Sequence, residues 1–205
     1  MTDSSIIKNH HMKIGLDLDD TIIDHSNNIV LLAQKYGIPD FSHENLETGR
    51  FASLKETLSP NFYKALREEL YEVLSKDAPP MTGSERAIQE LKENGIELYI
   101  ISRRSHPRTN ALLWIQERLP FISQENIYFV NLDEEKGALC HALKIDIFLD
   151  NKPEVLTHMP ERTISILFDG LGIYKENPPF QRVSSWNEFY EMCGYLRNRI
   201  ILATV

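Results

Sequence analysis

A pair of aspartates near the N-terminus is the group of residues best suited to chemistry. Asp17 and Asp19 end a short apolar run that starts at Met12, and Thr21 follows two residues later. Because side chains alternate along a strand, a buried strand here would release both carboxylates close together at its carboxyl end. Crowded carboxylates repel each other, so such a pair persists where a cation bridges it or one member holds a proton for catalysis. An ordinary acidic turn is the simpler alternative.

Three more polar side chains stand where they could complete a site. Ser102 ends the apolar segment 96–102, Lys136 opens a predicted helix, and Asp150 ends the apolar segment 145–150. If these segments are parallel strands, Ser102 and Asp150 lie at the same sheet edge as the aspartate pair. Each residue also has a plainer interpretation: a turn serine, a surface lysine paired with neighbouring acids, and an aspartate that opens a turn.

The order of these residues resembles the haloacid-dehalogenase-like (HAD) phosphatases over residues 12–190. The family motifs are Asp-x-Asp-x-Thr or Val, a strand-end Ser or Thr, a Lys, and an acidic strand end. They are matched in order by Asp17, Asp19 and Thr21, by Ser102, by Lys136 and by Asp150. Lys144 and Lys152 are competing candidates for the lysine. Many relatives carry a second acidic residue after the last motif, where this chain has Asn151.

The resemblance implies a phosphomonoester hydrolase with an aspartyl-phosphate intermediate. Asp17 would be the nucleophile and Asp19 the general acid and base, roles that an ionised carboxylate and a neighbouring carboxyl group can fill. Ser102 and Lys136 would bind the phosphoryl oxygens, where negative charge gathers. The implied cofactor is Mg²⁺, which prefers oxygen ligands, held by Asp17, Asp150 and the backbone carbonyl of Asp19.

The substrate is less sharply indicated than the reaction. Arg103 and Arg104 directly follow Ser102 and are candidate substrate-binding residues, although arginine is also common at surfaces. Trp114 and the peptides Ile-Ser-Arg-Arg, Leu-Asp-Asn-Lys-Pro-Glu and Ser-Ser-Trp-Asn-Glu resemble the deoxyribonucleotidase-like (5'-nucleotidase) branch of the family. This resemblance implies a small phosphorylated metabolite, first among them a 5'-nucleotide. The aromatic residues Phe41 and Phe51 could stack on a base, or could simply pack.

The order of the strands and helices expected to position these residues predicts an α/β fold. Strand patterns alternate with helix patterns, which indicates a Rossmann-like parallel sheet with helices on both faces. Residues 25–80 are predicted to form a small helical cap inserted after the first strand. Residues 12–24 and 81–196 are the predicted HAD-like core domain, and 1–11 and 197–205 are predicted terminal tails.

Composition narrows the choice of partners. A net charge of −8 argues against binding nucleic acid, whose phosphates attract Lys and Arg. No segment is apolar enough for a signal peptide or a membrane span, and the two cysteines lack ligand or disulfide spacing. We therefore expect a cytoplasmic enzyme with a small substrate, no nucleic-acid partner and no membrane partner. The sequence does not predict an oligomeric state.

Other activities share parts of this pattern. A HAD-fold phosphotransferase or mutase would carry the same four motifs. A dehalogenase would use Asp17 but has no leaving oxygen to protonate, so Asp19 favours phosphate chemistry. A non-catalytic binding protein on this fold would not need Asp17 or Asp19, and both are present.

Overall fold

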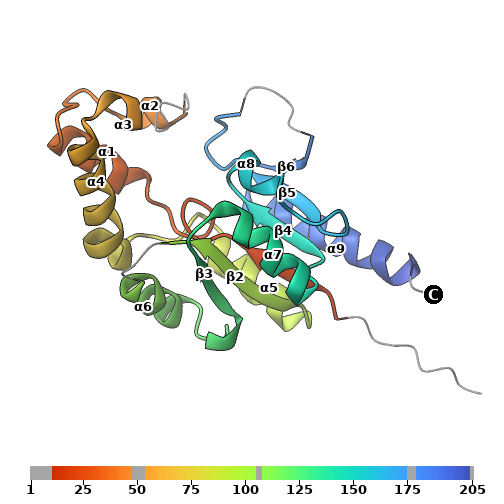
Figure 1. The fold of residues 1–205 in the computed structure, drawn as a ribbon. Coiled ribbons are helices and arrows are strands. Elements are labelled where there is room, and N and C mark those ends of the chain that lie inside the picture. The colour runs from red at the N-terminus through yellow and green to blue at the C-terminus, as the bar shows by residue number, and fades with distance from the viewer. Residues whose placement is uncertain (1–10, 48–53, 105–107, 175–178, 204–205) are drawn as a thin grey trace, which may run out of the picture.

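A parallel sheet forms the centre of the molecule. The structure is a computed structural model, and it describes residues 11–47, 54–104, 108–174 and 179–203. Six strands pair in the order β3-β2-β1-β4-β5-β6, and every pairing is parallel (Figure 1). The strands are β1 (Lys13–Leu16), β2 (Glu97–Arg103), β3 (Ile127–Val130), β4 (Ile147–Asp150), β5 (Ile164–Phe168) and β6 (Gln181–Val183). The predicted fold class is confirmed.

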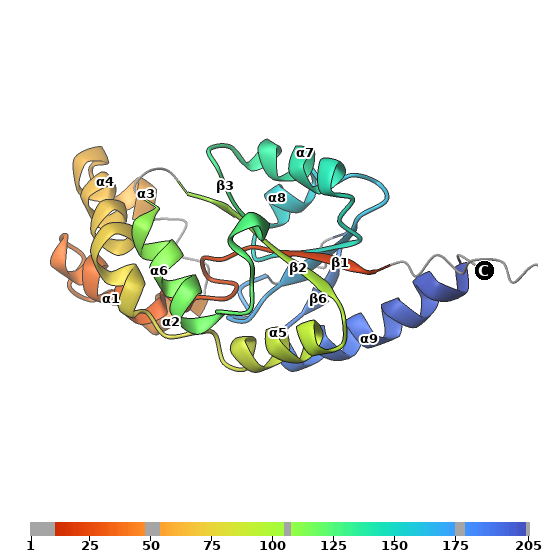
Figure 2. The same cartoon turned by 90° about the horizontal axis from the view of Figure 1, so that it is seen from below.

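Helices cover both faces of this sheet, as Figure 2 shows. One face packs against the helices α5 (Ser84–Glu93), α6 (Thr109–Arg118) and α9 (Trp186–Ala203). The other face packs against α7 (Asp133–Leu143) and α8 (Pro153–Leu156). A short 3-10 turn, η3 (Gln124–Asn126), precedes β3. Successive side chains of each strand point to opposite faces of the sheet and so supply both hydrophobic cores. The same alternation determines the face of the sheet to which a polar side chain at a strand end points.

A helical insert leaves the core after β1 and returns before α5. It contains α1 (Ser26–Lys35), α2 (His43–Glu47), α3 (Leu54–Thr57), α4 (Pro60–Glu69), the π-helical turn η1 (Leu70–Leu74) and the 3-10 turn η2 (Ser75–Asp77). The insert has a hydrophobic core of its own, to which every one of its helices contributes. Two short linkers join it to the sheet: the Met81 amide donates to the Ile22 carbonyl (2.7 Å) and the Asp24 amide to the Pro79 carbonyl (2.8 Å).

Some local predictions differ from the structure. The helical spacing of Phe62, Leu66, Leu70 and Val73 predicts one helix near 61–75, but the chain changes from α-helix to π-helix at Leu70 and to 3-10 helix at Ser75. The predicted polar loop at 39–50 includes the short helix α2. The helix α9 continues past residue 196 to Ala203. Residues 1–10 and Phe51 lie outside the described residues, and the division into domains and tails stays a prediction.

Candidate active site

Strand alternation directs Asp17 and Asp150 toward α7. In β1, Ile14 and Leu16 pack in the core beneath α5 and α9, so Gly15 and Asp17 face the opposite side. A Cβ on Gly15 would lie 2.6 Å from the Phe148 ring, which belongs to the core on the α7 side. In β4 the same alternation leaves Asp150 on that side. The two carboxylates therefore point toward the side chains of α7 that face the sheet.

The side chain of α7 that contacts both carboxylates is Lys136. Its ammonium Nζ lies 2.6 Å from Asp17 Oδ1 and 2.7 Å from Asp150 Oδ2. All three side chains are almost completely buried. We call Asp17, Lys136 and Asp150 the core cluster. Of the competing lysines, Lys152 is exposed and Lys144 is the left-handed C-cap of α7, so the structure brings only Lys136 to both carboxylates among the residues that it describes.

Gly137 allows α7 to approach closely enough for this contact. A Cβ at this position would lie 2.1 Å from the backbone carbonyl oxygen of His158, in the turn after α8. Real side chains do not tolerate such a distance, and a backbone atom cannot swing aside. Gly137 therefore sets the depth of α7, and with it the reach of the neighbouring Lys136.

Burial and charge act against each other in the core cluster. Burial raises the pKa of Asp150 to about 6, and the nearby charge of Asp17 adds to this rise, while Lys136 partly offsets it. For Lys136, burial alone would lower the pKa, but the Asp17 and Asp150 carboxylates outweigh burial and raise it. The lysine is therefore held as a cation at neutral pH, where it can face an anionic substrate.

Asp19 is held by a second group of residues. Arg104 donates from Nε to Asp19 Oδ2 (3.0 Å) and from Nη2 to Asp19 Oδ1, and the same Nη2 donates to Ser75 Oγ (2.8 Å). His25 Nε2 lies 2.8 Å from Asp19 Oδ1. We call Asp19, His25, Arg104 and Ser75 the junction cluster, because Arg104 belongs to the core and Ser75 to the insert.

The junction cluster favours the ionised form of Asp19. Burial would raise the pKa of this carboxyl group, but the Arg104 charge, followed by the hydrogen bond from His25, outweighs burial and lowers it. In return, Asp19 outweighs the effect of burial on His25 and raises the pKa of the imidazole. In this arrangement Asp19 is a carboxylate with fixed orientation, as a general base requires.

Three residues of this neighbourhood are not among the candidates from sequence. His25 and Ser75 are fully buried, and the Tyr71 ring lies nearly perpendicular to the His25 ring at a centroid distance of 5.9 Å. The Arg104 guanidinium carbon lies 4.8 Å from the centroid of the Tyr71 ring. His25 follows the aspartate motif by six residues, and only that proximity could have pointed to it; nothing in the sequence marks Tyr71 or Ser75.

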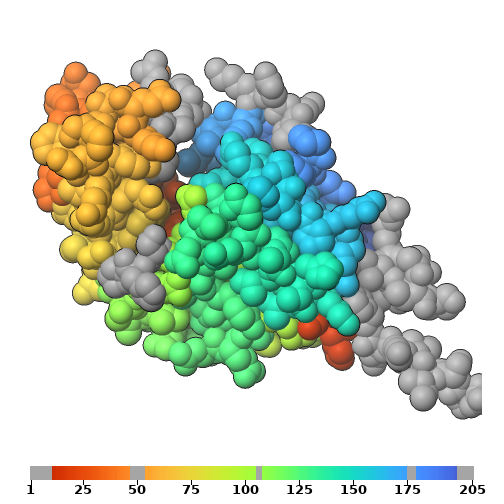
Figure 3. Space-filling model, in the orientation of Figure 1, coloured from red at the N-terminus to blue at the C-terminus, as the bar shows by residue number. Residues whose placement is uncertain are grey.

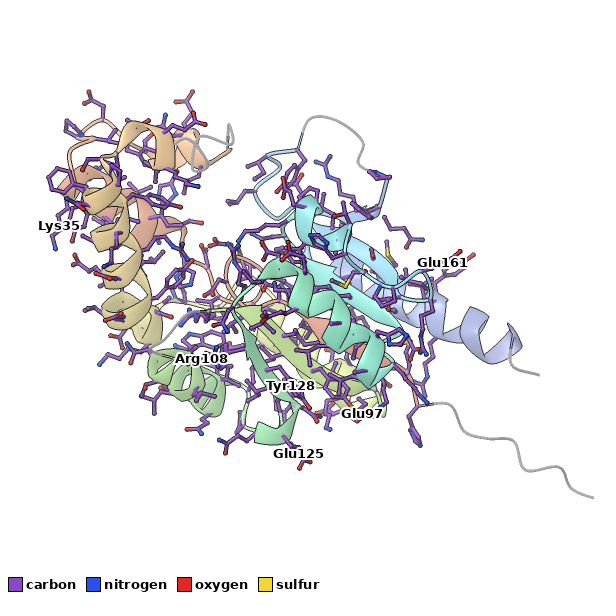
Figure 4. The ribbon with its side chains drawn as sticks, viewed as in Figure 1. Lys35, Glu97, Arg108, Glu125, Tyr128 and Glu161 are labelled. Atoms are coloured by element: carbon purple, nitrogen blue, oxygen red, sulfur yellow. The ribbon has the colours of Figure 1, made fainter. Side chains whose placement is uncertain are left out.

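The remaining candidates from sequence lie in different surroundings. Ser102 is buried, one residue before the end of β2. Arg103 points to the surface side of α7, where its Nη1 lies 2.7 Å from Asp133 Oδ2 with a side chain 37% exposed. Arg108, labelled in Figure 4, lies on the side of the core that faces the insert and donates to the Arg104 carbonyl (3.1 Å). The substrate-binding roles of Arg103 and Arg104 stay predictions.

The oxygen atoms around Asp150 suit a hard divalent cation. Within the described part of the chain, no three His, Cys, Asp or Glu side chains form a metal-binding group. The Asn151 Oδ1 atom is nevertheless buried without a hydrogen-bond partner among the described residues, next in sequence to Asp150. The two carboxylates and this unpartnered amide oxygen are of the type that Mg²⁺ prefers as ligands, since the ion completes its shell with waters and substrate oxygens.

A hollow between the insert and the core is the candidate place for a substrate. Figure 3 shows a hollow between them, with atoms from the N-terminal part of the chain visible on its floor. Leu171, in the loop after β5, packs against the hydrophobic core of the insert and so borders the same region. The carboxyl ends of parallel strands are where ligands bind in α/β sheets.

The parallel sheet with its helical insert is a fold shared with solved structures of known class. A phosphatase from Clostridium acetobutylicum, described as predicted, superimposes with a TM-score of 0.64 at 18% identity over 89% of this chain and 98% of that one. The "putative HAD-hydrolase YfnB" from Bacillus subtilis, solved bound to magnesium, superimposes with a TM-score of 0.59 at 13% identity over 89% of this chain and 98% of that one. The fold is that of the HAD-like hydrolases.

The family within this class follows from sequence comparison. Residues 11–201 match the model of the family described as "5' nucleotidase, deoxy (Pyrimidine), cytosolic type C protein". A "Putative nucleotidase OB0422" from Oceanobacillus iheyensis is 26% identical over 189 residues, which is 88% of this chain and 98% of the relative. The chain belongs to this nucleotidase family and is a HAD-type phosphatase.

Proposed function

We propose that this protein hydrolyses small phosphomonoesters, 5'-nucleotides foremost, through a phosphorylated Asp17. The observation that carries the proposal is the core cluster, in which one ammonium group joins two buried carboxylates from different strands. Family membership supports the choice of a nucleotide. The match to a cytosolic family also supports a cytoplasmic location, and the finding that no described helix is long and apolar enough to cross a membrane agrees with it.

In the first step the Asp17 carboxylate attacks phosphorus, and the bond from phosphorus to the ester oxygen breaks. Lys136 neutralises the phosphoryl oxygens as the nucleophile approaches, a task that its raised pKa favours. The Ser102 hydroxyl is buried near the end of β2 and is the candidate second donor to those oxygens. The product of this step is an acyl phosphate on Asp17 and a free alcohol.

Asp19 handles the protons of both steps. It gives a proton to the departing ester oxygen and then takes one from the water that hydrolyses the aspartyl-phosphate. The hydrogen bonds from Arg104 and His25 suit the second step directly, because they hold the group ionised and oriented. For the first step Asp19 takes up a proton on one oxygen from solvent or from the substrate monoanion, while Arg104 keeps its hydrogen bond to the other oxygen and so still orients the group. The Arg104 Nη1 atom is buried without a partner among the described residues, and we assign it as a candidate donor to the substrate.

The implied Mg²⁺ would be held by Asp17, Asp150 and the Asp19 carbonyl, with Asn151 Oδ1 as a further ligand or as a partner of a bound water. When bound, the ion supplies positive charge that offsets repulsion between Asp17 and the substrate dianion. The chain's acidic balance, a net charge of −8, makes such local positive charge necessary for any anionic substrate.

A substrate panel tests the proposed reaction. The purified protein, with magnesium, is incubated with nucleoside and deoxynucleoside 5'-monophosphates, sugar phosphates, a phosphoserine peptide and a 5'-phosphorylated oligonucleotide, and released phosphate is measured. We expect the mononucleotides to react fastest and the peptide and oligonucleotide slowest. A clear preference for the oligonucleotide would refute the small-substrate proposal.

The Asp17→Asn variant tests the intermediate. We expect turnover to fall by more than about 10³-fold, because an amide cannot form the acyl phosphate. Asp77→Asn is the matched control, since the Asp77 side chain is 79% exposed on the insert. A phosphate analogue such as fluoroberyllate should be found on Asp17 in a structure of the wild-type protein. An analogue bonded to another residue would overturn the assignment.

A further inference from the structure

Arg104 contacts the predicted acid and base and the insert at the same time. One guanidinium group donates to both Asp19 oxygens and to the Ser75 hydroxyl, which lies 2.8 Å from Nη2. Arg104 is only 2% exposed, so water does not compete for these bonds. Arginine suits such a role because its planar fork fixes the angles between its partners. The orientation of Asp19 is therefore linked to the position of Ser75.

The part of the insert that meets Arg104 is irregular. The chain passes from the π-helical turn η1 to the 3-10 turn η2 at Ser75, and the Arg104 guanidinium lies over the ring of Tyr71 in η1. Isolated π-helical turns occur frequently at functional sites, where they redirect side chains that a regular helix would carry elsewhere. Here the irregular turns place both Tyr71 and Ser75 on one core side chain.

Other contacts at this junction do not reach the site. The Trp114 indole donates to the Ala78 carbonyl (2.8 Å), and the Asn110 amide donates to the Glu72 carbonyl. Both fix the end of the insert to α6. Among the described contacts, two reach the Asp19 carboxylate from the insert: His25, at the start of the insert, contacts it directly, and Ser75, at the end of the insert, reaches it through Arg104.

We infer that Arg104 is a positioning residue that couples the insert to Asp19 through Ser75. This inference rests on the proposed function, since it assigns the coupling to the residue that protonates the leaving group. When the insert settles over a substrate, Ser75 fixes the guanidinium, and the guanidinium fixes the direction in which the Asp19 carboxyl group faces. Without the Ser75 hydroxyl, Arg104 would still neutralise Asp19 but would hold it in a less defined direction.

The test uses substituted phenyl phosphates, which have the same shape and different leaving-group pKa values. For each, kcat/KM is measured, because this constant covers only the steps up to departure of the leaving group. In Ser75→Ala we expect kcat/KM to fall by about tenfold for phenyl phosphate. A loss of this size corresponds to the free energy of one hydrogen bond to a charged group. For 4-nitrophenyl phosphate, which departs without a proton, we expect a fall of less than about twofold. The plot of log kcat/KM against leaving-group pKa should become steeper.

Two more variants separate coupling from a loss of structure. Ser59→Ala removes a hydroxyl from the same insert, where it accepts a bond from the Phe62 amide that caps α4 (3.4 Å), and it should shift all substrates by one small factor. Arg104→Lys keeps the charge but cannot bond Asp19 and Ser75 with the same fork, so its plot should also become steeper.

The outcomes that contradict the inference are distinct from those that contradict the function. Parallel plots for wild type, Ser75→Ala and Arg104→Lys would mean that these residues only stabilise the fold, and would overturn the coupling while leaving the phosphatase intact. A wild-type protein that hydrolyses none of the phenyl phosphates or nucleotides would refute the proposed function, and the coupling with it.

Discussion

The core cluster and the junction cluster lie at the same edge of the sheet but are built from different parts of the molecule. Asp17, Lys136 and Asp150 all belong to the sheet or to α7, which packs directly on it. In the junction cluster, Asp19 and Arg104 belong to the core, whereas His25 and Ser75 border or belong to the insert. If the proposed roles are assigned to these residues, phosphate binding depends on the core alone, while proton transfer depends on the insert as well.

The largest effect that would sharpen this comparison is expected from Lys136→Met. The change leaves two buried carboxylates without their shared cation, which should lower kcat by about 10²–10³-fold and stability by about 3 kcal/mol. Steady-state kinetics and urea unfolding measure the two losses. Lys64→Met is the control, since the Lys64 side chain is 75% exposed. Unchanged activity in Lys136→Met would exclude the core cluster as the phosphate site.

Phe41→Ala is expected to lower stability about as much as Lys136→Met does, but without a specific effect on activity. Phe41 is 5% exposed and packs within the hydrophobic core of the insert, so its removal should cost about 3 kcal/mol in the free energy of unfolding. Phe62, which is 52% exposed, provides a control that should cost less than about 1 kcal/mol. Below its melting temperature, Phe41→Ala should affect all substrates alike. A changed ranking of substrates would mean that Phe41 faces the substrate.

Two substitutions, one in the core cluster and one at the residue next to it, should change the magnesium requirement to different degrees. Chelation should abolish activity, and magnesium should restore it. Asp150→Ala should raise the magnesium concentration needed for half-maximal activity by about hundredfold, and Asn151→Ala by about tenfold, because only the first change removes a charge. Asn187→Ala is the control, since Asn187 is an exposed partner of Glu191. Full activity in chelator would rule out the metal.

The smallest effect is expected from Arg103→Ala. Arg103 forms an exposed ion pair with Asp133, and such pairs contribute less than about 1 kcal/mol. Stability should change by no more than about 0.5 kcal/mol, and KM for nucleotides should stay within about twofold of wild type. A large rise in KM would restore Arg103 as a substrate-binding residue and would place part of the substrate beside α7, outside both clusters.

The core cluster could be anticipated from sequence because each member follows a regular pattern. Asp17 and Asp150 end apolar strands, and Lys136 lies on the helix that leads into the second of these strands. A parallel sheet brings such strand ends to one edge whatever the details of the loops. The alternation of side chains then decides which helix they meet. Lys136 accordingly contacts both Asp17 and Asp150, and Arg104 contacts Asp19, while the roles of these residues stay predictions.

The junction cluster could not be anticipated in the same way. Ser75 lies where a π-helical turn becomes a 3-10 turn, and neither turn has a periodic pattern in the sequence. The sequence around Thr82 and Glu85 suggests a capping box, yet α5 begins at Ser84 after Gly83, whose φ of 83° is left-handed. His25 reads as a loop residue before a helix, and its burial against Asp19 depends on how the insert returns to the core.

The central place of β1 in the sheet bears on when the enzyme becomes active during its synthesis. β1 is the first strand to be made, yet its two neighbours are β2 and β4. Lys136 lies 119 residues beyond Asp17, and Lys13 bonds a side chain 133 residues further along. Such long-range pairing forms slowly and late. A nascent chain that has not reached α7 therefore carries the proposed nucleophile without its cation, so unfinished copies of this length on the ribosome should not hydrolyse nucleotides.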